Sequence, residues 1–130
     1  ELYTKAYSRL SGLKLSGEDK QLYNKLSVLA SVSGKYDAYK SFSDSGYVTM
    51  AADSLVCAAG RCAVNAENAK EYGCELQLEQ LKNIISDTLS SQYGLSYDDA
   101  IALYNIDDRD DYTLALTQKL NELGIKEETK

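Results

Sequence analysis

Residues 47–72, YVTMAADSLVCAAGRCAVNAENAKEY, lie between Gly46 and Gly73 and hold no proline and one further glycine, Gly60. Small and apolar residues recur at positions 51, 55, 58, 62, 66 and 69, with a second row at 52, 56, 59 and 63. This is the spacing of a helix face. The pattern predicts one helix roughly 39 Å long, at about 1.5 Å per residue. Because its apolar stripe is broad, neighbouring helices must cover it on more than one side.

Helical spacing continues through the rest of the chain, and no segment shows the alternation of a strand. We predict further helices over residues 1–11, 16–34, 35–45, 74–92, 96–104 and 108–124. Ser16 with Asp19, and Ser96 with Asp98 and Asp99, are expected to cap their helices. Gly60 inside the central helix predicts a kink or a close helix crossing. The sequence thus predicts an all-α, irregular bundle of about seven helices, with a single domain at 1–124 and a frayed tail at 125–130.

Composition excludes several classes of function. The 130 residues carry a net charge of −6 and no cluster of basic side chains. A nucleic-acid partner is therefore not expected, and an anionic membrane surface would repel the chain. No run of about 20 apolar residues is present, so we expect no direct membrane insertion by this chain. The sequence begins inside an apparent helix, and we interpret it as part of a longer protein.

No motif predicts catalysis, a metal or a cofactor. The chain lacks histidine, which excludes nucleophile–histidine pairs within it. The aspartates at 107, 108, 110 and 111 do not follow the spacing of a calcium-binding EF-hand and are interpreted as a carboxylate-rich helix start. We therefore predict a non-enzymatic chain with no catalytic residue, no metal ligand and no cofactor.

The three cysteines, Cys57, Cys62 and Cys74, do not match a zinc site, because no close second pair and no histidine accompany them. On one helix, Cys57 and Cys62 would point about 140° apart, which is poor geometry for a disulfide. We expect buried free thiols that act as small apolar side chains.

Tyrosine is the unusual residue of this composition, with eleven copies against one phenylalanine and no tryptophan. Tyr36, Tyr39 and Phe42 follow one another at intervals of three and would form an oblique aromatic ridge on a short helix. We predict that this ridge is a binding site for a protein or peptide, with one end reaching solvent. The alternative is that these rings fill the core.

Two segments resemble the glycine–aromatic–alanine turn of a tetratricopeptide repeat. The first is GKYDA at 34–38, which follows Leu29 and Ala30. The second is SGY at 45–47, followed by Ala51 and Leu55. The resemblance implies one repeat-like helical hairpin over residues 35–72.

The segments SGYVTMAADSL, AENAKEYG and YGLSYDDAIALYNIDDRDDY also resemble a helical accessory region of Firmicutes membrane proteins, including certain serine/threonine kinases. This resemblance implies an extracytoplasmic part of a membrane protein. The odd number of cysteines favours the alternative, a cytoplasmic location.

We therefore expect a non-catalytic protein- or peptide-binding or sensor module of a larger bacterial protein. The first alternative is a structural spacer or dimerisation domain, for which a homodimer would bury an alanine-rich face. The second is an enzyme that uses carboxylates alone, for which a cleft with two facing carboxylates would be required.

Overall fold

The computed structural model describes residues 2–10 and 17–124, and within these ranges it is all-α, as the sequence predicts. The elements are α1 (Leu2–Leu10), α2 (Gly17–Asp44), α3 (Val48–Val64), α4 (Ala66–Tyr72), α5 (Glu75–Thr88), the π-helical turn η1 (Leu89–Tyr93), α6 (Tyr97–Tyr104) and α7 (Arg109–Glu122). The predicted end of the first helix at residue 11, the predicted cap at Ser16 and the tail at 125–130 lie outside the described residues.

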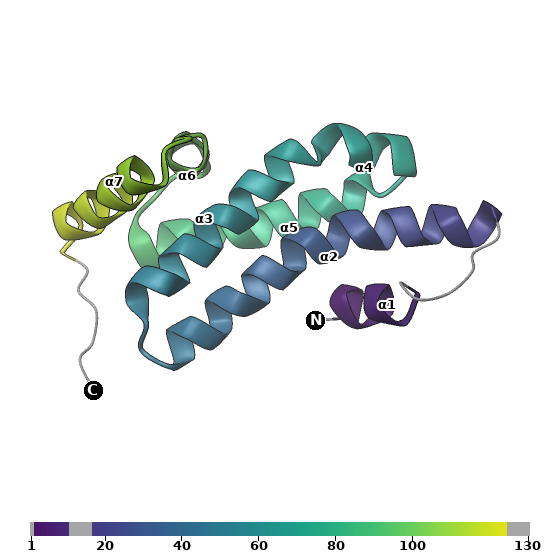
Figure 1. Ribbon diagram of the computed structural model, residues 1–130, viewed down its shortest axis with the longest axis horizontal. Coiled ribbons are helices and arrows are strands. Elements are labelled where there is room, and N and C mark those ends of the chain that lie inside the picture. The colour runs from purple at the N-terminus through teal and green to yellow at the C-terminus, as the bar shows by residue number, and fades with distance from the viewer. Residues whose placement is uncertain (1, 11–16, 125–130) are drawn as a thin grey trace.

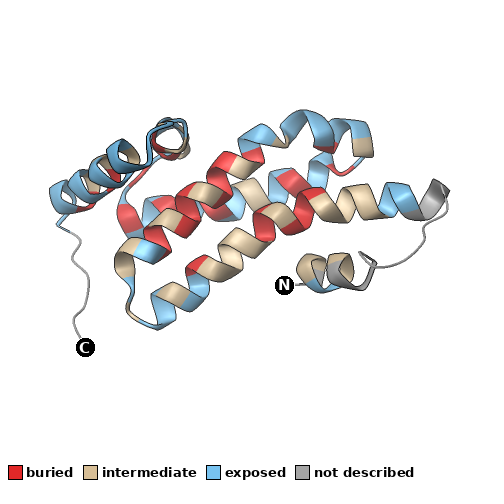
Figure 2. Ribbon diagram, viewed as in Figure 1, coloured by how far each residue is buried: buried red, intermediate tan, exposed pale blue. Residues whose placement is uncertain are grey.

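The centre of the bundle is a hairpin of α2 and α3, with α5 packed across both helices (Figure 1). Helix α1 lies along α2, whereas α6 and α7 lie at the other end and pack chiefly against α3 and each other. Buried residues gather where α2, α3 and α5 face one another (Figure 2). The largest fully buried side chains are Leu55, Ile85, Leu89, Leu95, Val32, Val56 and Cys74.

The predicted stripe on α3 is the core of the fold. Its buried members are Ala51, Ala52, Leu55, Val56, Ala58, Ala59, Cys62 and, on α4, Ala69. Two predicted members, Ala63 and Ala66, are exposed instead. They flank Asn65, where the predicted single helix is divided into α3 and α4. The Asn65 side chain donates to the Arg61 carbonyl at 2.9 Å, and such local bonds compete with the helical pattern.

The predicted helix end at Gly34 is wrong, because α2 runs without interruption from Gly17 to Asp44. A glycine in a helix costs about 1 kcal/mol relative to alanine. Here Val32 is fully buried and Tyr39 is 7% exposed, so core residues on both sides of Gly34 hold the chain in one helix. Burial of two such side chains outweighs the propensity of one residue.

Replacement of Gly34 by alanine is expected to stabilise the protein. A Cβ atom at this position would meet nothing within 4 Å, so only the helix propensity changes. We expect a gain of about 0.5–1 kcal/mol in the free energy of unfolding. Urea denaturation followed by circular dichroism measures it, and a lower midpoint would show that Gly34 is needed for close packing.

Helix ends that depend on local chemistry are where the sequence predicts them. Gly73 ends α4 in the left-handed conformation, with φ of 75°. Ser96 accepts a hydrogen bond from the Asp99 N–H at 3.0 Å, and the Asp99 carboxylate accepts one from the Ser96 N–H, which completes a capping box before α6. Asp108 caps α7 through the Asp111 N–H at 2.9 Å.

Gly60 marks a close helix crossing. The ring of Tyr104, the last residue of α6, lies against the Gly60 backbone, in the space that a Cβ atom would occupy. Helix α3 continues through Gly60, so the role of the glycine is to let α6 pack closely against α3. The absence of a side chain at one position therefore determines how the α6–α7 pair sits on the hairpin.

Candidate functional site

The predicted aromatic ridge lies on α2 and faces α5 and η1. Tyr39 is buried among the core residues, whereas Tyr36 and Phe42 are half-buried and pack at the core margin. The Tyr39 ring lies 5.6 Å from that of Tyr36 and 6.4 Å, edge-on, from that of Tyr93. The ridge is thus anchored at its middle, and its two ends reach the surface. We call Tyr36, Tyr39 and Phe42 the α2 aromatic surface.

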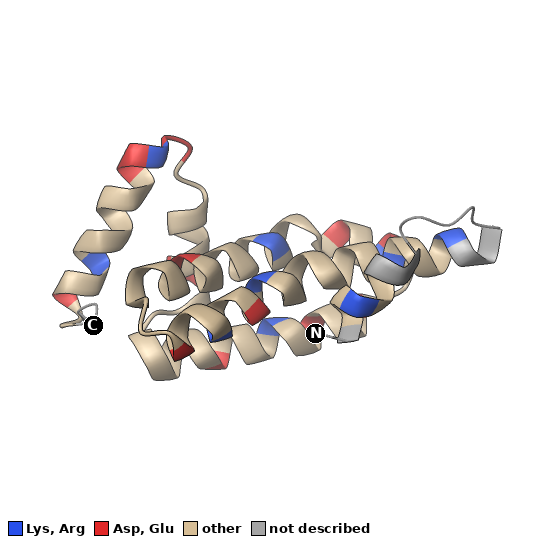
Figure 3. Cartoon of the chain, turned by 60° about the horizontal axis from the view of Figure 1, so that its bottom comes forward, with Lys and Arg blue, Asp and Glu red and all other residues tan. Residues whose placement is uncertain are grey.

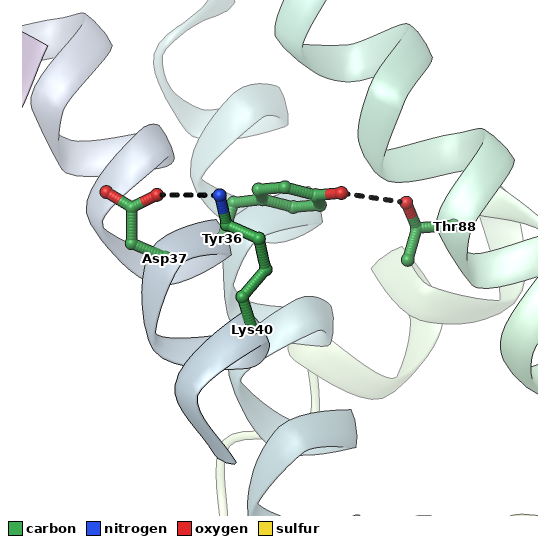
Figure 4. Close-up of polar contacts among 4 residues, drawn as sticks. All are labelled: Tyr36, Asp37, Lys40 and Thr88. Atoms are coloured by element: carbon green, nitrogen blue, oxygen red, sulfur yellow. Dashed lines mark hydrogen bonds and ion pairs between the residues drawn. The ribbon is translucent and has the colours of Figure 1, made fainter. Parts of the chain in front are cut away.

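Tyr36 is held from both sides (Figure 4). Its hydroxyl lies 3.2 Å from Thr88 Oγ1. Thr88 donates its own hydrogen to the Ile84 carbonyl at 2.8 Å, so Tyr36 is the donor of this bond. Lys40 Nζ lies 5.5 Å from the centre of the Tyr36 ring and 3.7 Å from Asp37 Oδ1. The ring is therefore fixed in place while part of it stays accessible.

A cavity of about 330 Å³ lies between α3, α4, α5 and α6. Cys62 and Leu78 are its buried side chains, and the rest of the lining is Ala63, Ala66, Lys70, Glu75, Glu79, Lys82 and Tyr97. Tyr97 donates to the Ala59 carbonyl at 3.2 Å, and Lys82 Nζ lies 4.9 Å from the centre of its ring. Burial raises the pKa of both Tyr97 and Cys62 to about 12, so each is protonated at neutral pH.

A second cavity, of about 280 Å³, lies where α2, α3, α6 and α7 meet. Its lining is Lys35, Asp53, Cys57, Tyr104, Ile106, Asp107, Arg109 and Tyr112. The Tyr112 hydroxyl donates to Asp53 Oδ1, and the Cys57 thiol lies 3.9 Å from the same oxygen. Burial, followed by the bond to Asp53, holds the pKa of Tyr112 above its usual range.

Neither cavity presents an activated nucleophile. Burial and the neighbouring Asp53 carboxylate raise the pKa of the Cys57 thiol. Because the thiolate is the reactive form, Cys57 and Cys62 are weak nucleophiles at neutral pH. Asp53 and Asp107 share the second cavity, the kind of arrangement that a carboxylate-only enzyme requires, and that alternative stays a hypothesis.

The cysteines agree in part with the predicted buried free thiols, and the acidic residues near position 108 form the predicted helix start. All three cysteines are free, with Cys62 and Cys74 buried and Cys57 half-buried. Acidic side chains gather at the start of α7 (Figure 3), where Asp108 caps the helix. Across residues 2–10 and 17–124, no three histidine, cysteine, aspartate or glutamate side chains are grouped as a metal site would require.

Sequence reasoning did not find the cavities, because residues far apart in the chain build them. Asp53 and Tyr112 are 59 positions apart and come from different helices. One local signal was available, since Asp53 is a carboxylate placed among the small and apolar residues of the central stripe. A carboxylate next to buried positions needs a polar partner, and Tyr112 provides it.

Comparisons with protein-family models, curated proteins and solved structures find no match to this chain. Among the helices that the structure describes, none is long and apolar enough to cross a membrane. The class of this chain is defined by its fold, which is an all-α helical bundle.

Proposed function

We propose that this chain is a non-catalytic module that recognises a protein or peptide through the α2 aromatic surface. The observation that carries the proposal is the fixed but accessible ring of Tyr36, bonded to Thr88 at one end and flanked by Lys40 at its face. A tyrosine that is already ordered loses little conformational entropy when a partner binds, and it offers both apolar area and a hydrogen-bonding group.

Charge favours a basic partner. The chain carries a net charge of −6, and the exposed Asp44 lies on α2 two residues after Phe42, whereas Asp37 is paired with Lys40. Complementary charge raises association rates and selects against partners of the same sign. A peptide that combines an apolar side chain with lysine or arginine would match both properties of this surface.

The wider context is also a proposal. The SGY segment at 45–47 forms the turn of the α2–α3 hairpin, which supports a repeat-like hairpin, whereas the GKYDA segment lies inside α2. From the resemblance to accessory regions of Firmicutes membrane proteins, we propose that the chain belongs to a larger bacterial membrane protein. We propose that it lies on the extracytoplasmic side of the membrane.

Selection of peptides from a displayed random library tests the recognition proposal. We expect selected peptides to be basic, and their Kd to rise about tenfold with Tyr36→Ala or Phe42→Ala, the loss typical of an interface anchor. The matched control is Tyr47→Ala, because Tyr47 is 52% exposed but lies outside the α2 aromatic surface. Circular dichroism confirms that each variant is folded.

Two results would contradict the proposal. One is a library from which no peptide is enriched on the folded chain. The other is a set of peptides that bind the Tyr36 and Phe42 variants as tightly as the original chain, or that lose affinity only with Tyr47→Ala.

A further inference from the structure

The cavity between α2, α3, α6 and α7 is lined by charged side chains of both signs that form no ion pair with one another. Lys35 and Arg109 supply positive charge, and Asp53 and Asp107 supply negative charge. All four belong to the described residues, and no ion pair within 4.0 Å joins any of them. The nearby Arg61 is engaged elsewhere, because its guanidinium donates to the Ser31 carbonyl at 3.1 Å and lies 3.4 Å from its hydroxyl.

Asp53 is oriented by the protein and still has an acceptor to offer. Its Oδ1 atom accepts the Tyr112 hydroxyl and has the Cys57 thiol beside it. Among the described residues, both of its side-chain contacts are made by Oδ1, and its Oδ2 atom has no hydrogen-bond partner. A half-buried carboxylate that is fixed at one oxygen and open at the other suits a charged donor such as an ammonium group.

The combination of charges selects the class of ligand. A lone cation would be repelled by Lys35 and Arg109, and a lone anion by Asp53 and Asp107. A zwitterion offers a group of opposite charge to each sign of charge in the lining. Ile106 and Tyr104 also line the cavity, and its volume of about 280 Å³ suits a small molecule.

We propose that this cavity binds a free α-amino acid with an apolar side chain. The ammonium group binds Asp53, the carboxylate binds Arg109 and Lys35, and the side chain packs on Ile106 and Tyr104. This proposal is independent of peptide recognition at the α2 aromatic surface, because it uses a different set of residues.

Titration of the isotope-labelled chain with millimolar L-leucine, L-isoleucine, L-methionine and L-phenylalanine, followed by amide chemical shifts, tests the assignment. We expect at least one of them to shift the amides of Asp53 and Tyr112. L-leucinamide and N-acetyl-L-leucine, which lack one charge each, should bind about tenfold or more weakly than L-leucine, because each leaves one charged partner unpaired.

Variants locate the site. Arg109→Gln and Asp53→Asn should each weaken binding about tenfold or more. Arg109 is exposed, so its replacement leaves the fold intact even if Asp53→Asn perturbs it. The matched control is Lys82→Gln in the other cavity, which should bind like the original chain. The proposal is overturned if none of the four amino acids binds, if the two blocked derivatives bind equally well, or if Arg109→Gln has no effect.

Discussion

Replacement of Gly60 by alanine should destabilise the protein, although alanine is the better helix former. Helix propensity alone would favour alanine by about 1 kcal/mol. However, the new methyl group would coincide with the near side of the Tyr104 ring, which cannot move aside without displacing α6. Overpacking of this kind typically costs about 1–3 kcal/mol, so we expect a net loss in the free energy of unfolding.

The two interior glycines of this chain make a matched pair for that experiment. Gly34→Ala should raise the urea midpoint and Gly60→Ala should lower it, because only Gly60 has a ring in the space of its absent Cβ. A double-mutant cycle with Tyr104→Ala isolates the contact. Once the ring is removed, Gly60→Ala should become neutral or stabilising. A destabilisation that persists without the ring would assign the effect to something other than this crossing.

Ala58→Leu should also lower stability, by about 1–3 kcal/mol, because it adds three carbons to a filled site. Ala58 is fully buried in the middle of the α3 stripe. Its neighbours on that stripe, Leu55 and Cys62, are also buried. Helix α3 is packed against α2, α5 and α6, so the larger side chain has no free side to occupy. Chemical denaturation measures the loss as a lower midpoint at an unchanged m-value, the slope of the unfolding free energy against denaturant concentration.

Ala63→Leu is the control for that substitution, since Ala63 lies on the same helix but is exposed. Its effect should stay within about 0.5 kcal/mol, as for ordinary surface substitutions. Equal effects of the two replacements would show that Ala58 does not sit in a close-packed interface.

Local chemistry explains which parts of the fold could be predicted. Apolar periodicity identified the helical class, and the ends at Gly73, Ser96 and Asp108 follow from conformations or bonds that involve neighbouring residues. The errors at Gly34 and Asn65 have different origins. At Gly34, burial of the core residues on both sides overrides a local preference, whereas at Asn65 a local side-chain bond to the Arg61 carbonyl competes with the helical pattern.

One candidate site could be predicted in part from local spacing, and the other could not be predicted from the sequence. The spacing of Tyr36, Tyr39 and Phe42 correctly predicted that they share one face of a helix, but not that Tyr39 would be buried against Tyr93. The cavity around Asp53 could not be predicted, because its walls come from helices whose pairing is a tertiary property. A single sequence gives little information on such pairings.

The attachment of α6 and α7 to the bundle has a consequence for partial unfolding. These two helices rest chiefly on α3 and on each other, whereas α2, α3 and α5 share the central core (Figure 1). Segments with fewer partners open at lower free energy than the core does. The backbone amides of α6 and α7 should therefore exchange with solvent hydrogen as one cooperative unit, before those of the α2–α3 hairpin, and the Tyr104 ring would leave Gly60 in that opening.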